Sequence, residues 1–463
     1  MKRILVERDA DEWKKPLVDA IKKYIIDNYL EEVSCRPFTP KKCLGDIVFK
    51  KKYAYQFFCA LKVLIKHFLY LRLELANAEI DGVAIGRYVV ATVMRHPKAA
   101  KSSSFALFRK PKIILIAACY YAVAEITSKD IEYSYLNDSS YLYGIVNDVL
   151  LKNGVKVFRQ GYPYCLVECD KGCKRQIDPL RLRLNRAGFS YKKAEEYVNA
   201  RLENPQKNIG YFQIEETLIN NFAVEKRKKV AVVYTHSFTD AQLVYGYDGF
   251  ESVYFWLIFT VEKLIDQGYF VLLKGHPNFW APDYQSKVVA WDKDVWLSVL
   301  KYVKKMDLVQ VIDFPLYNGT LLGLLDKSET LLVSHHGNAI IEGAAKKFKT
   351  VSSVCSLWGD FYCFGESWRT KSEYNRLLEK PLQEFACNPE EALRFVYDNY
   401  MNPLGYHGPF YWKRLIAPKL GVEEAELERF PSLIIPSQIR CYDDVVKNIT
   451  KGIVRFSDFG SSS

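Results

Sequence analysis

Three strand-like runs in the second half of the chain, each ending in a histidine, constrain the fold more than any other feature. They are VAVVYTHSFTDA (230–241), FVLLKGHPNF (270–279) and TLLVSHHGNA (330–339). Each is a short apolar, β-branched stretch that stops in small and polar residues, which is typical of a strand buried on both faces. In parallel sheets, ligands bind outside the carboxyl ends of the strands. The runs therefore predict a parallel sheet whose ligand-binding edge holds four of the seven histidines: His236, His276, His335 and His336.

The segments between these runs have the pattern of helices. Residues 251–268 carry apolar residues at helical spacing and close on a glycine, as helix C-termini often do. Further elements follow in alternation: helix 294–306, strand 308–314, short helix 321–326, helix 338–347 and a final strand 350–355. Because strands and helices alternate with short connections, the sequence predicts a doubly wound α/β domain.

The length of the chain, 463 residues, predicts more than one domain, since it exceeds what one ordinary hydrophobic core holds. We expect three parts. They are an N-terminal α/β domain over residues 1–225, the regular α/β domain over 226–390, and C-terminal helices with a flexible tail over 391–463.

The N-terminal part is less regular. Residues 55–75 form a long apolar-rich helix, for which we weigh core packing against a position on a membrane surface, because basic residues interrupt it. We expect a buried strand within 110–122 that leads into a helix, a helix over 138–153, a strand over 155–160 and a charged helix over 178–203. These elements predict a second, looser α/β unit.

Composition fits a cytoplasmic protein. Hydrophobic residues make up 49% and charged residues 26% of the chain, as in ordinary globular proteins. No run reaches the roughly 18 apolar residues of a membrane span, and the charged N-terminus lacks a signal-peptide core. Eleven cysteines at irregular spacings favour free thiols in a reducing compartment.

The formal net charge of +11 favours anionic partners such as nucleotide phosphates, acidic glycans or phospholipid headgroups. No motif of a nucleic-acid-binding fold is present, so nucleic acid is not an expected partner. The C-x3-C-x3-C spacing of Cys165, Cys169 and Cys173 is not that of zinc sites, and the histidines lack the i, i+4 spacing of helical zinc motifs. We therefore predict neither a metal nor a cofactor.

The first two runs end in residues suited to catalysis and anion binding. In HSFTDA, Asp240 lies four residues after His236, where a carboxylate acts as a nucleophile or takes a proton from a hydroxyl. Capping of the following helix by Asp240 explains that residue equally well. In KGHP, Lys274 and His276 offer a charge and a hydrogen bond to a phosphate, and Pro277 ends the strand. An ordinary loop histidine is the alternative for this short segment.

The third run gives the most specific signal. A small, polar turn leads directly into a helix, and helix N-termini bind phosphate through their free backbone N–H groups. Gly337 allows close backbone approach. Three side chains of the turn are hydrogen-bond donors: Ser334, His335 and His336. Glu342, one turn in, is placed to accept from ribose hydroxyls; the alternative is that Asn338 caps an ordinary helix and Glu342 is solvated.

In this order, the three segments resemble those of the bacterial capsule and surface-polysaccharide glycosyltransferases, nearest to the retaining β-Kdo transferases that use CMP-activated 3-deoxy-octulosonic acid. The resemblance covers residues 230–378 and extends weakly through 81–96 and 137–144. This chain reads KGHP where KPHP is commoner, and its third segment has a doubled histidine. The resemblance implies a GT-B fold, with two Rossmann-type domains facing each other across a cleft and C-terminal helices.

The resemblance also implies roles for individual residues. Asp240 is implied as the catalytic carboxylate, assisted by His236 and His276. The implied contacts to the donor nucleotide are Lys274, Pro277, Ser334, His335, His336, Gly337, Asn338, Glu342 and Arg369. Tyr374 is a further polar candidate beside Arg369, and Asp138 and Tyr141 are expected to contact the acceptor.

The sequence thus predicts a glycosyltransferase that moves a sugar from a nucleotide-sugar donor, with CMP-Kdo as the best guess, to a glycan or glycolipid acceptor. Peripheral association with the inner face of the cytoplasmic membrane is left open. Two enzyme alternatives remain, an inverting glycosyltransferase and a transferase that uses a CDP-polyol. A non-catalytic module that binds glycan or nucleotide in a polysaccharide assembly complex is the alternative of another class.

Overall fold

The computed structural model describes residues 2–7, 33–38, 51–70, 74–101, 103–135, 141–161, 165–168, 190–203, 229–239, 243, 246–280, 287–359, 361–401 and 433–435. By its internal contacts the chain forms two compact units. Unit 1 comprises residues 1–89, 112–190 and 396–463, and unit 2 comprises residues 90–111 and 191–395. The division falls inside two helices, α4 (Ile85–Met94) and α6 (Ser103–Thr127).

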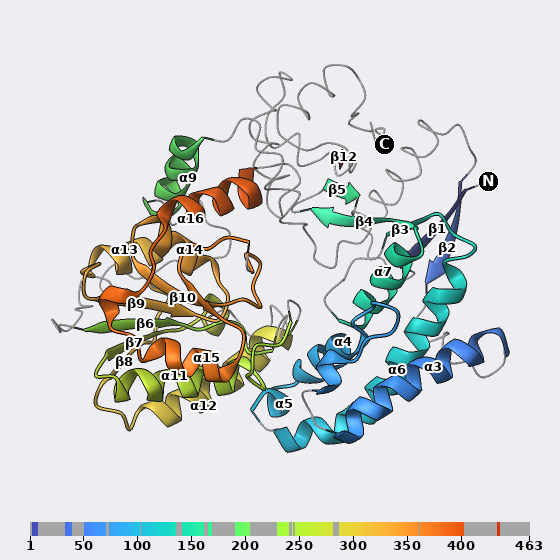
Figure 1. Cartoon of the computed structure of the whole chain (residues 1–463), viewed down its shortest axis with the longest axis horizontal. Helices are drawn as coiled ribbons and strands as arrows, with labels where there is room; N and C mark the ends of the chain where they lie inside the picture. Colours follow the sequence, from blue (N-terminus) through green and yellow to red (C-terminus); the bar gives the residue numbers. More distant parts are fainter. Residues whose placement is uncertain are drawn as a thin grey trace. The chain divides into compact units, whose positions relative to one another are not determined.

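Unit 2 is built on a six-stranded sheet in the order β8-β7-β6-β9-β10-β11 (Figure 1). The strands are β6 (Val230–Tyr234), β7 (Phe270–Lys274), β8 (Val309–Ile312), β9 (Thr330–Ser334), β10 (Lys349–Ser353) and β11 (Glu366–Trp368), and every pairing between them is parallel. Numbered along the chain, this order is 3-2-1-4-5-6, the order of the Rossmann fold. The predicted doubly wound α/β domain is confirmed.

Helices cover both faces of this sheet. Figure 1 shows α13 (Asn318–Gly323) and α14 (Asn338–Ala345) on one side, and α11 (Val253–Asp266), α12 (Lys287–Val303) and α15 (Lys371–Leu378) on the other. The central strands β6, β7 and β9 are buried along their whole length, as their apolar sequences predict. The inner face of α11 contributes Trp256, Leu257 and Val261 to the core between helices and sheet.

The predicted elements of this domain are present with shifted ends. Helix α12 begins at Lys287 rather than 294, and α13 begins at Asn318 rather than 321. Strand β10 is not the last strand, because β11 adds to its outer edge. Three residues are too few for a periodic pattern, so β11 has no signal in the sequence.

Unit 1 contains a second sheet, in the order β2-β1-β3-β4-β5-β12. Its strands are β1 (Lys2–Glu7), β2 (Val33–Phe38), β3 (Tyr133–Tyr135), β4 (Lys156–Gly161), β5 (Cys165–Glu168) and β12 (Leu433–Ile435). All pairings are parallel except that between β4 and β5. Its helices include α3 (Lys51–Tyr70), the short 3-10 helix η2 (Glu74–Asn77) and α7 (Leu142–Lys152). The prediction of a second α/β unit is confirmed.

The strand predicted within 110–122 is wrong. Those residues lie inside α6, a continuous helix of 25 residues that includes Pro111. Short apolar runs do not separate a buried strand from a buried helix, and here the isoleucine-rich run passes into Ala117 and Ala118, which favour helix.

The division into units also differs from the predicted boundaries at residues 225 and 390. Helix α9 (Tyr191–Glu203) packs against α13 and α14, and α5 (Pro97–Lys101) packs against α11 and α12, so both belong to unit 2. Ser252 donates a 2.7 Å hydrogen bond to the carbonyl of Ala100, which ties α5 to the start of α11. Helix α16 (Pro389–Val396) closes unit 2, whereas β12 returns to the unit 1 sheet.

Within the described residues, no helix has both the length and the apolar character needed to span a bilayer. The helix predicted over 55–75 is α3, which ends at Tyr70.

Candidate functional site

The order of strands in unit 2 puts its topological switch point between β6 and β9. These neighbouring strands are followed by α11 and α14, which lie on opposite faces of the sheet. At such a switch point the loops after the strands separate and leave a crevice outside their carboxyl ends. In the register of the sheet, Tyr234 of β6 pairs with both Lys274 of β7 and Ser334 of β9. The three predicted segments therefore leave the sheet at the same level.

The four histidines after these strands form one cluster. The ring centroids of His236 and His336 are 3.8 Å apart, and those of His236 and His276 are 5.6 Å apart. His335 lies against His336 with centroids 4.8 Å apart, and the Nδ1 atoms of the two rings are 2.6 Å apart. The sequence predicted these residues at one edge, and the structure brings all four into contact.

Burial keeps two of these histidines uncharged. Desolvation, with the neighbouring His236 and Lys274, lowers the pKa of His276 to about 3. Desolvation and the other three histidines lower the pKa of His336 well below its usual value. Both rings are therefore neutral imidazoles at pH 7, which donate or accept a hydrogen bond without carrying charge.

Asp248 contacts His335 at one end of the cluster, and no pattern in the sequence predicted it. Its carboxylate lies 2.9 Å from His335 Nε2 and accepts a hydrogen bond from the hydroxyl of Ser353. Burial pushes the pKa of Asp248 upward, but His335, Ser353 and the backbone N–H of Phe250 outweigh it and hold that pKa below its usual value. Asp248 is therefore an ionised acceptor.

The loop around Asp248 requires glycine. Gly249 has a φ of +100°, and a Cβ there would come within 2.3 Å of the backbone nitrogen of Lys371. The segment YGYDGF, an aspartate among glycines and aromatics before a helix, was the signal available in the sequence.

The carboxylate of Asp248 determines which ring nitrogens of His335 and His336 carry hydrogen. A carboxylate only accepts, so His335 Nε2 carries a hydrogen and donates. If His335 is neutral, its Nδ1 accepts from His336 Nδ1–H, and His336 Nε2 is left as a lone pair. If His335 is protonated, its Nδ1–H donates to His336, whose hydrogen then resides on Nε2. Asp248 and His335 thus set the tautomer of His336.

Asp292 of α12 anchors the loop after β6, and the sequence did not predict this role either. One carboxylate oxygen accepts from the backbone N–H groups of Phe238 and Thr239 and from the Thr239 hydroxyl, at 2.9 to 3.0 Å. The other accepts from the hydroxyl of Ser237 at 2.6 Å. Asp292 is fully buried, so these bonds fix the HSFT segment that precedes Asp240.

We expect Asp292→Ala to release this loop. Four lost hydrogen bonds and a buried cavity will lower the free energy of unfolding by about 3 kcal/mol. Hydrogen exchange at the amides of Phe238 and Thr239, followed by mass spectrometry, will accelerate. Asp292→Asn is the matched control: its amide oxygen still accepts from both amides, and the Ser237 hydroxyl turns to accept from the new NH2 group. Equal exchange in the alanine variant and the wild type would contradict the anchoring role.

Lys274 supplies a buried positive charge beside the histidines. It is 7% exposed, and no hydrogen bond from its ammonium group is found among the described residues. Desolvation lowers the pKa of Lys274 to about 8, and the charge of Glu342 only partly opposes this. A buried cation with little compensation favours an incoming anion.

Glu342 is engaged by protein groups. One carboxylate oxygen accepts two hydrogen bonds from the guanidinium of Arg201, at 3.0 and 3.1 Å. The other accepts from the Asn318 amide at 2.8 Å, and Asn318 in turn accepts from the hydroxyl of Tyr234. The structure thus assigns Glu342 to a bridge between α9, α13 and α14, and the predicted ribose contact stays a prediction.

The N-terminus of α14 has no side-chain cap. Gly337 occupies the cap position with an extended backbone, and Asn338 is the exposed first residue of the helix, so the alternative in which Asn338 caps α14 is wrong. A Cβ on Gly337 would meet only the Ser334 hydroxyl, at 3.4 Å. The N–H groups of Asn338 and Ala339 thus have no side-chain cap, and residue 337 places no side chain beside them, which suits an anion.

The remaining predicted residues lie in several places. Pro277 starts a 3-10 turn (Pro277–Phe279) directly after His276. Arg369 is exposed between β11 and α15, and its backbone N–H donates to Glu373. It follows β11, which β10 separates from β9 in the sheet, so it leaves the sheet two strands away from the turn at residues 334–337. Tyr374 is a core residue, since its ring is fully buried and its hydroxyl hydrogen-bonds Thr260; the expectation of a polar site role is wrong.

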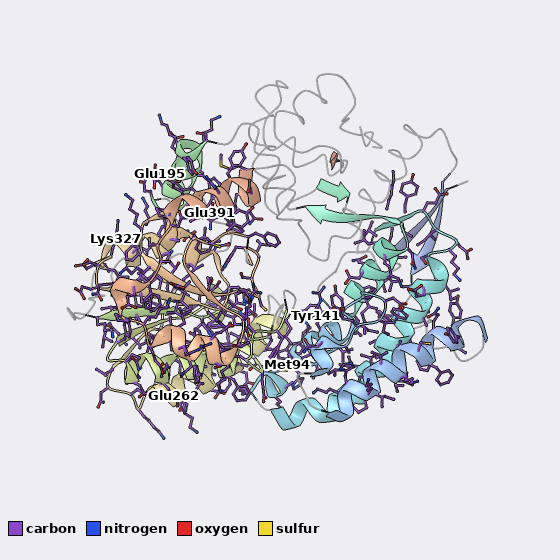
Figure 2. The ribbon with its side chains drawn as sticks, in the orientation of Figure 1. Met94, Tyr141, Glu195, Glu262, Lys327 and Glu391 are labelled. Carbon is purple, nitrogen blue, oxygen red and sulfur yellow. The ribbon has the colours of Figure 1, made fainter. Side chains whose placement is uncertain are left out.

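Tyr141 is buried at the start of α7 in unit 1 (Figure 2). Asp240 and Asp138, the predicted catalytic and acceptor-binding aspartates, lie outside the described residues. Across the part of the chain that the structure describes, no group of three or more histidine, cysteine, aspartate or glutamate side chains has a geometry that would hold a metal ion.

The glycine of KGHP has a local explanation. A Cβ at Gly275 would come within 2.5 Å of the Trp280 ring, and the indole N–H of Trp280 donates to the carbonyl of Asp313. A proline at this position, as in the commoner KPHP, would collide with that ring. The departure therefore follows from packing and leaves Lys274 and His276 in place.

Comparisons with known proteins give limited likeness. No protein-family model matches the chain, and no curated protein matches it. Among solved structures, the chain is similar to the KpsC β-Kdo 2,4 transferase of Thermosulfurimonas dismutans, with a TM-score of 0.32 and 10% identity over 57% of this chain and 78% of that one. It is also similar to the UDP-GlcNAc 2-epimerase of Methanocaldococcus jannaschii, with a TM-score of 0.26 and 10% identity over 85% and 98% of the two chains. Because both TM-scores are low, the fold is identified from the strand order of the two sheets.

Proposed function

We propose that the protein is a glycosyltransferase that takes a sugar from a nucleotide-activated donor, with CMP-Kdo as the first choice. The observation that carries the proposal is the convergence of three loops on the switch point of a Rossmann-ordered sheet. These loops bring a buried lysine, neutral histidines and an uncapped helix N-terminus to one edge. That combination suits the phosphate of a nucleotide better than it suits a metal or an apolar ligand.

In this proposal the phosphate binds at α14 and Lys274. The N–H groups of α14 donate to its oxygens, and the Ser334 hydroxyl turns from the Tyr234 carbonyl, 3.5 Å away, to donate as well. The ammonium group supplies the opposite charge. An anion beside Lys274 raises the pKa of that lysine, so the charge is strongest when the ligand is bound. The same groups stabilise the negative charge that develops on the phosphate as the sugar leaves.

Asp240 performs the substitution in this proposal. An oxygen of its carboxylate attacks the anomeric carbon, the bond from that carbon to the phosphate oxygen breaks, and CMP leaves with the electron pair. An acceptor hydroxyl then attacks the same carbon and displaces Asp240, while His236 takes the hydroxyl proton. The anchoring of residues 237–239 by Asp292 supports this role, because it fixes the chain directly before Asp240.

The test is incubation of the purified protein with a panel of nucleotide sugars that includes CMP-Kdo, followed by intact and peptide mass spectrometry. We expect a sugar-sized mass increment on the peptide that contains Asp240. Asp240→Ala will lose the increment and at least about 10³-fold in turnover, with an unchanged melting temperature. Nucleotide release without an adduct, retained by Asp240→Ala, would replace the double displacement with an inverting transferase. Binding of a donor without any release would overturn the enzyme in favour of a binding module.

A further inference from the structure

Helix α3 has one buried face and one exposed apolar face. Tyr53, Ala60 and Leu64 are buried within unit 1. On the outer side, Tyr55 is 74% exposed, Phe58 63% and Ile65 42%. The inner face of α3 therefore packs in the core, as one of the two predictions for this helix states, and its outer face contacts solvent.

The exposed residues form one stripe. In chain order the exposed residues are Tyr55, Phe58, Lys62, Ile65 and Lys66, at separations of three, four, three and one residues. With 3.6 residues per turn, these five positions span about 100° of the helix circumference, so they share one side of α3. From residue 55 to residue 65 the stripe runs about 15 Å along the helix axis. We call these five residues the α3 stripe.

The charge of α3 has a single sign. Its 20 residues, KKYAYQFFCALKVLIKHFLY, contain four lysines and no acidic residue. The chain as a whole carries a formal charge of +11, so repulsion opposes the pairing of this surface with a second copy of itself. The complementary surface is anionic and takes up apolar side chains.

An anionic phospholipid bilayer meets both requirements. Aromatic rings and aliphatic side chains enter the boundary between headgroups and acyl chains, while lysine ammonium groups extend to the lipid phosphates. The helix does not cross the bilayer, because no described helix is long and apolar enough to do so. An amphipathic helix lying in the plane of the interface fits these observations.

We propose that the α3 stripe docks the protein on an anionic membrane surface, with Tyr55, Phe58 and Ile65 inserted and Lys62 and Lys66 at the level of the headgroups. The docking surface belongs to unit 1 and involves none of the residues of the unit 2 site. It is therefore independent of the proposed transferase activity, and its test needs no substrate.

The test is co-sedimentation of the full-length protein with vesicles of phosphatidylcholine, with and without phosphatidylglycerol. We expect binding to the anionic vesicles that weakens with salt. Lys62→Gln and Lys66→Gln will each weaken it about fivefold. The triple variant Tyr55→Ser, Phe58→Ser, Ile65→Ser will weaken it at least about tenfold. Leu297→Ser and Leu324→Ser are the matched controls, because those leucines are 64% and 48% exposed outside α3, and binding will persist in both.

A second measurement places the helix at the bilayer. In Phe58→Trp, the added indole is expected to shift its emission to the blue on vesicle binding and to be quenched by brominated lipids. Equal binding to neutral and anionic vesicles, or unchanged binding by the triple variant, would overturn the proposal. Self-association in sedimentation velocity without lipid, lost in the triple variant, would instead assign the stripe to a second copy of the chain.

Discussion

Lys274→Met will stabilise the protein and weaken its binding of CMP, so that one substitution moves stability and affinity in opposite directions. The ammonium group is buried at the end of β7 with little compensation from its surroundings. Methionine fills a similar volume without a charge, so the folded protein no longer holds a desolvated cation. The same change removes the charge that we assign to phosphate binding.

The size and pH dependence of the gain follow from the pKa of Lys274, which burial lowers from 10.5 to about 8. Each pKa unit corresponds to about 1.4 kcal/mol, so the variant gains up to about 3 kcal/mol at pH 7. Between pH 8 and 10.5 the unfolded chain binds more protons at this lysine than the folded one does, so the wild type becomes more stable as pH rises. The gain is therefore complete below pH 8 and vanishes above 10.5.

Urea unfolding at several pH values and calorimetric titration with CMP measure the two effects. We expect the affinity for CMP to fall about 10- to 100-fold, the value of a hydrogen bond to a charged group. Lys229→Met is the matched control, because Lys229 precedes β6 at the opposite end of the sheet and donates to the carbonyl of Gln267. It will leave the affinity for CMP unchanged. A destabilised Lys274→Met, or one with full affinity, would refute the assigned role.

The second large effect is expected from Asp248→Asn, which will invert the tautomers of His335 and His336 in the state in which His335 is neutral. The oxygen of the new amide takes over the bond to the Phe250 N–H, so its NH2 group faces His335 Nε2. That nitrogen must then accept, which moves the hydrogen of neutral His335 to Nδ1. His335 then donates to His336, whose hydrogen moves to Nε2.

Imidazole ¹⁵N shifts in protein labelled at its histidines will report this inversion without any substrate. Assignments come from His335→Gln and His336→Gln. Asp248→Asn is expected to cost about 2–3 kcal/mol of stability, since it weakens charged hydrogen bonds in the core, and to slow any transferase reaction on the order of 10²-fold or more. Asp294→Asn, which removes a half-exposed carboxylate paired with Lys101, is the control and will leave the tautomers unchanged. Unchanged shifts in Asp248→Asn would disprove the link from Asp248 to His336.

The four histidines of the site could be predicted as neighbours from the sequence, for a simple reason. His236, His276, His335 and His336 each follow a strand that is buried throughout and mostly apolar, and such strands are recognisable in the sequence. In a parallel sheet the ends of these strands meet at one edge, so residues far apart in the chain are predictable neighbours. Their contact in one cluster follows from that rule.

Asp248 and Asp292 could not be predicted in this way. Asp248 lies in an irregular loop, and Asp292 lies on a helix whose start was placed seven residues too late. Neither position follows a strand, and an aspartate in a helix or loop is ordinarily solvated. Only the packing of α12 under the 237–239 loop, and of the 246–250 loop against β10, brings these carboxylates to their partners.

The sequence by itself determined the α/β class, the central strands of unit 2 and the histidines at the carboxyl ends of those strands, because strand burial leaves a local pattern of residues. The tertiary structure decided the order of the strands, the assignment of α5 and α9 to unit 2, the helical state of residues 110–122 and the two buried carboxylates. These depend on contacts between residues distant in the chain, and the free energy of such contacts has no signature in any local stretch of sequence.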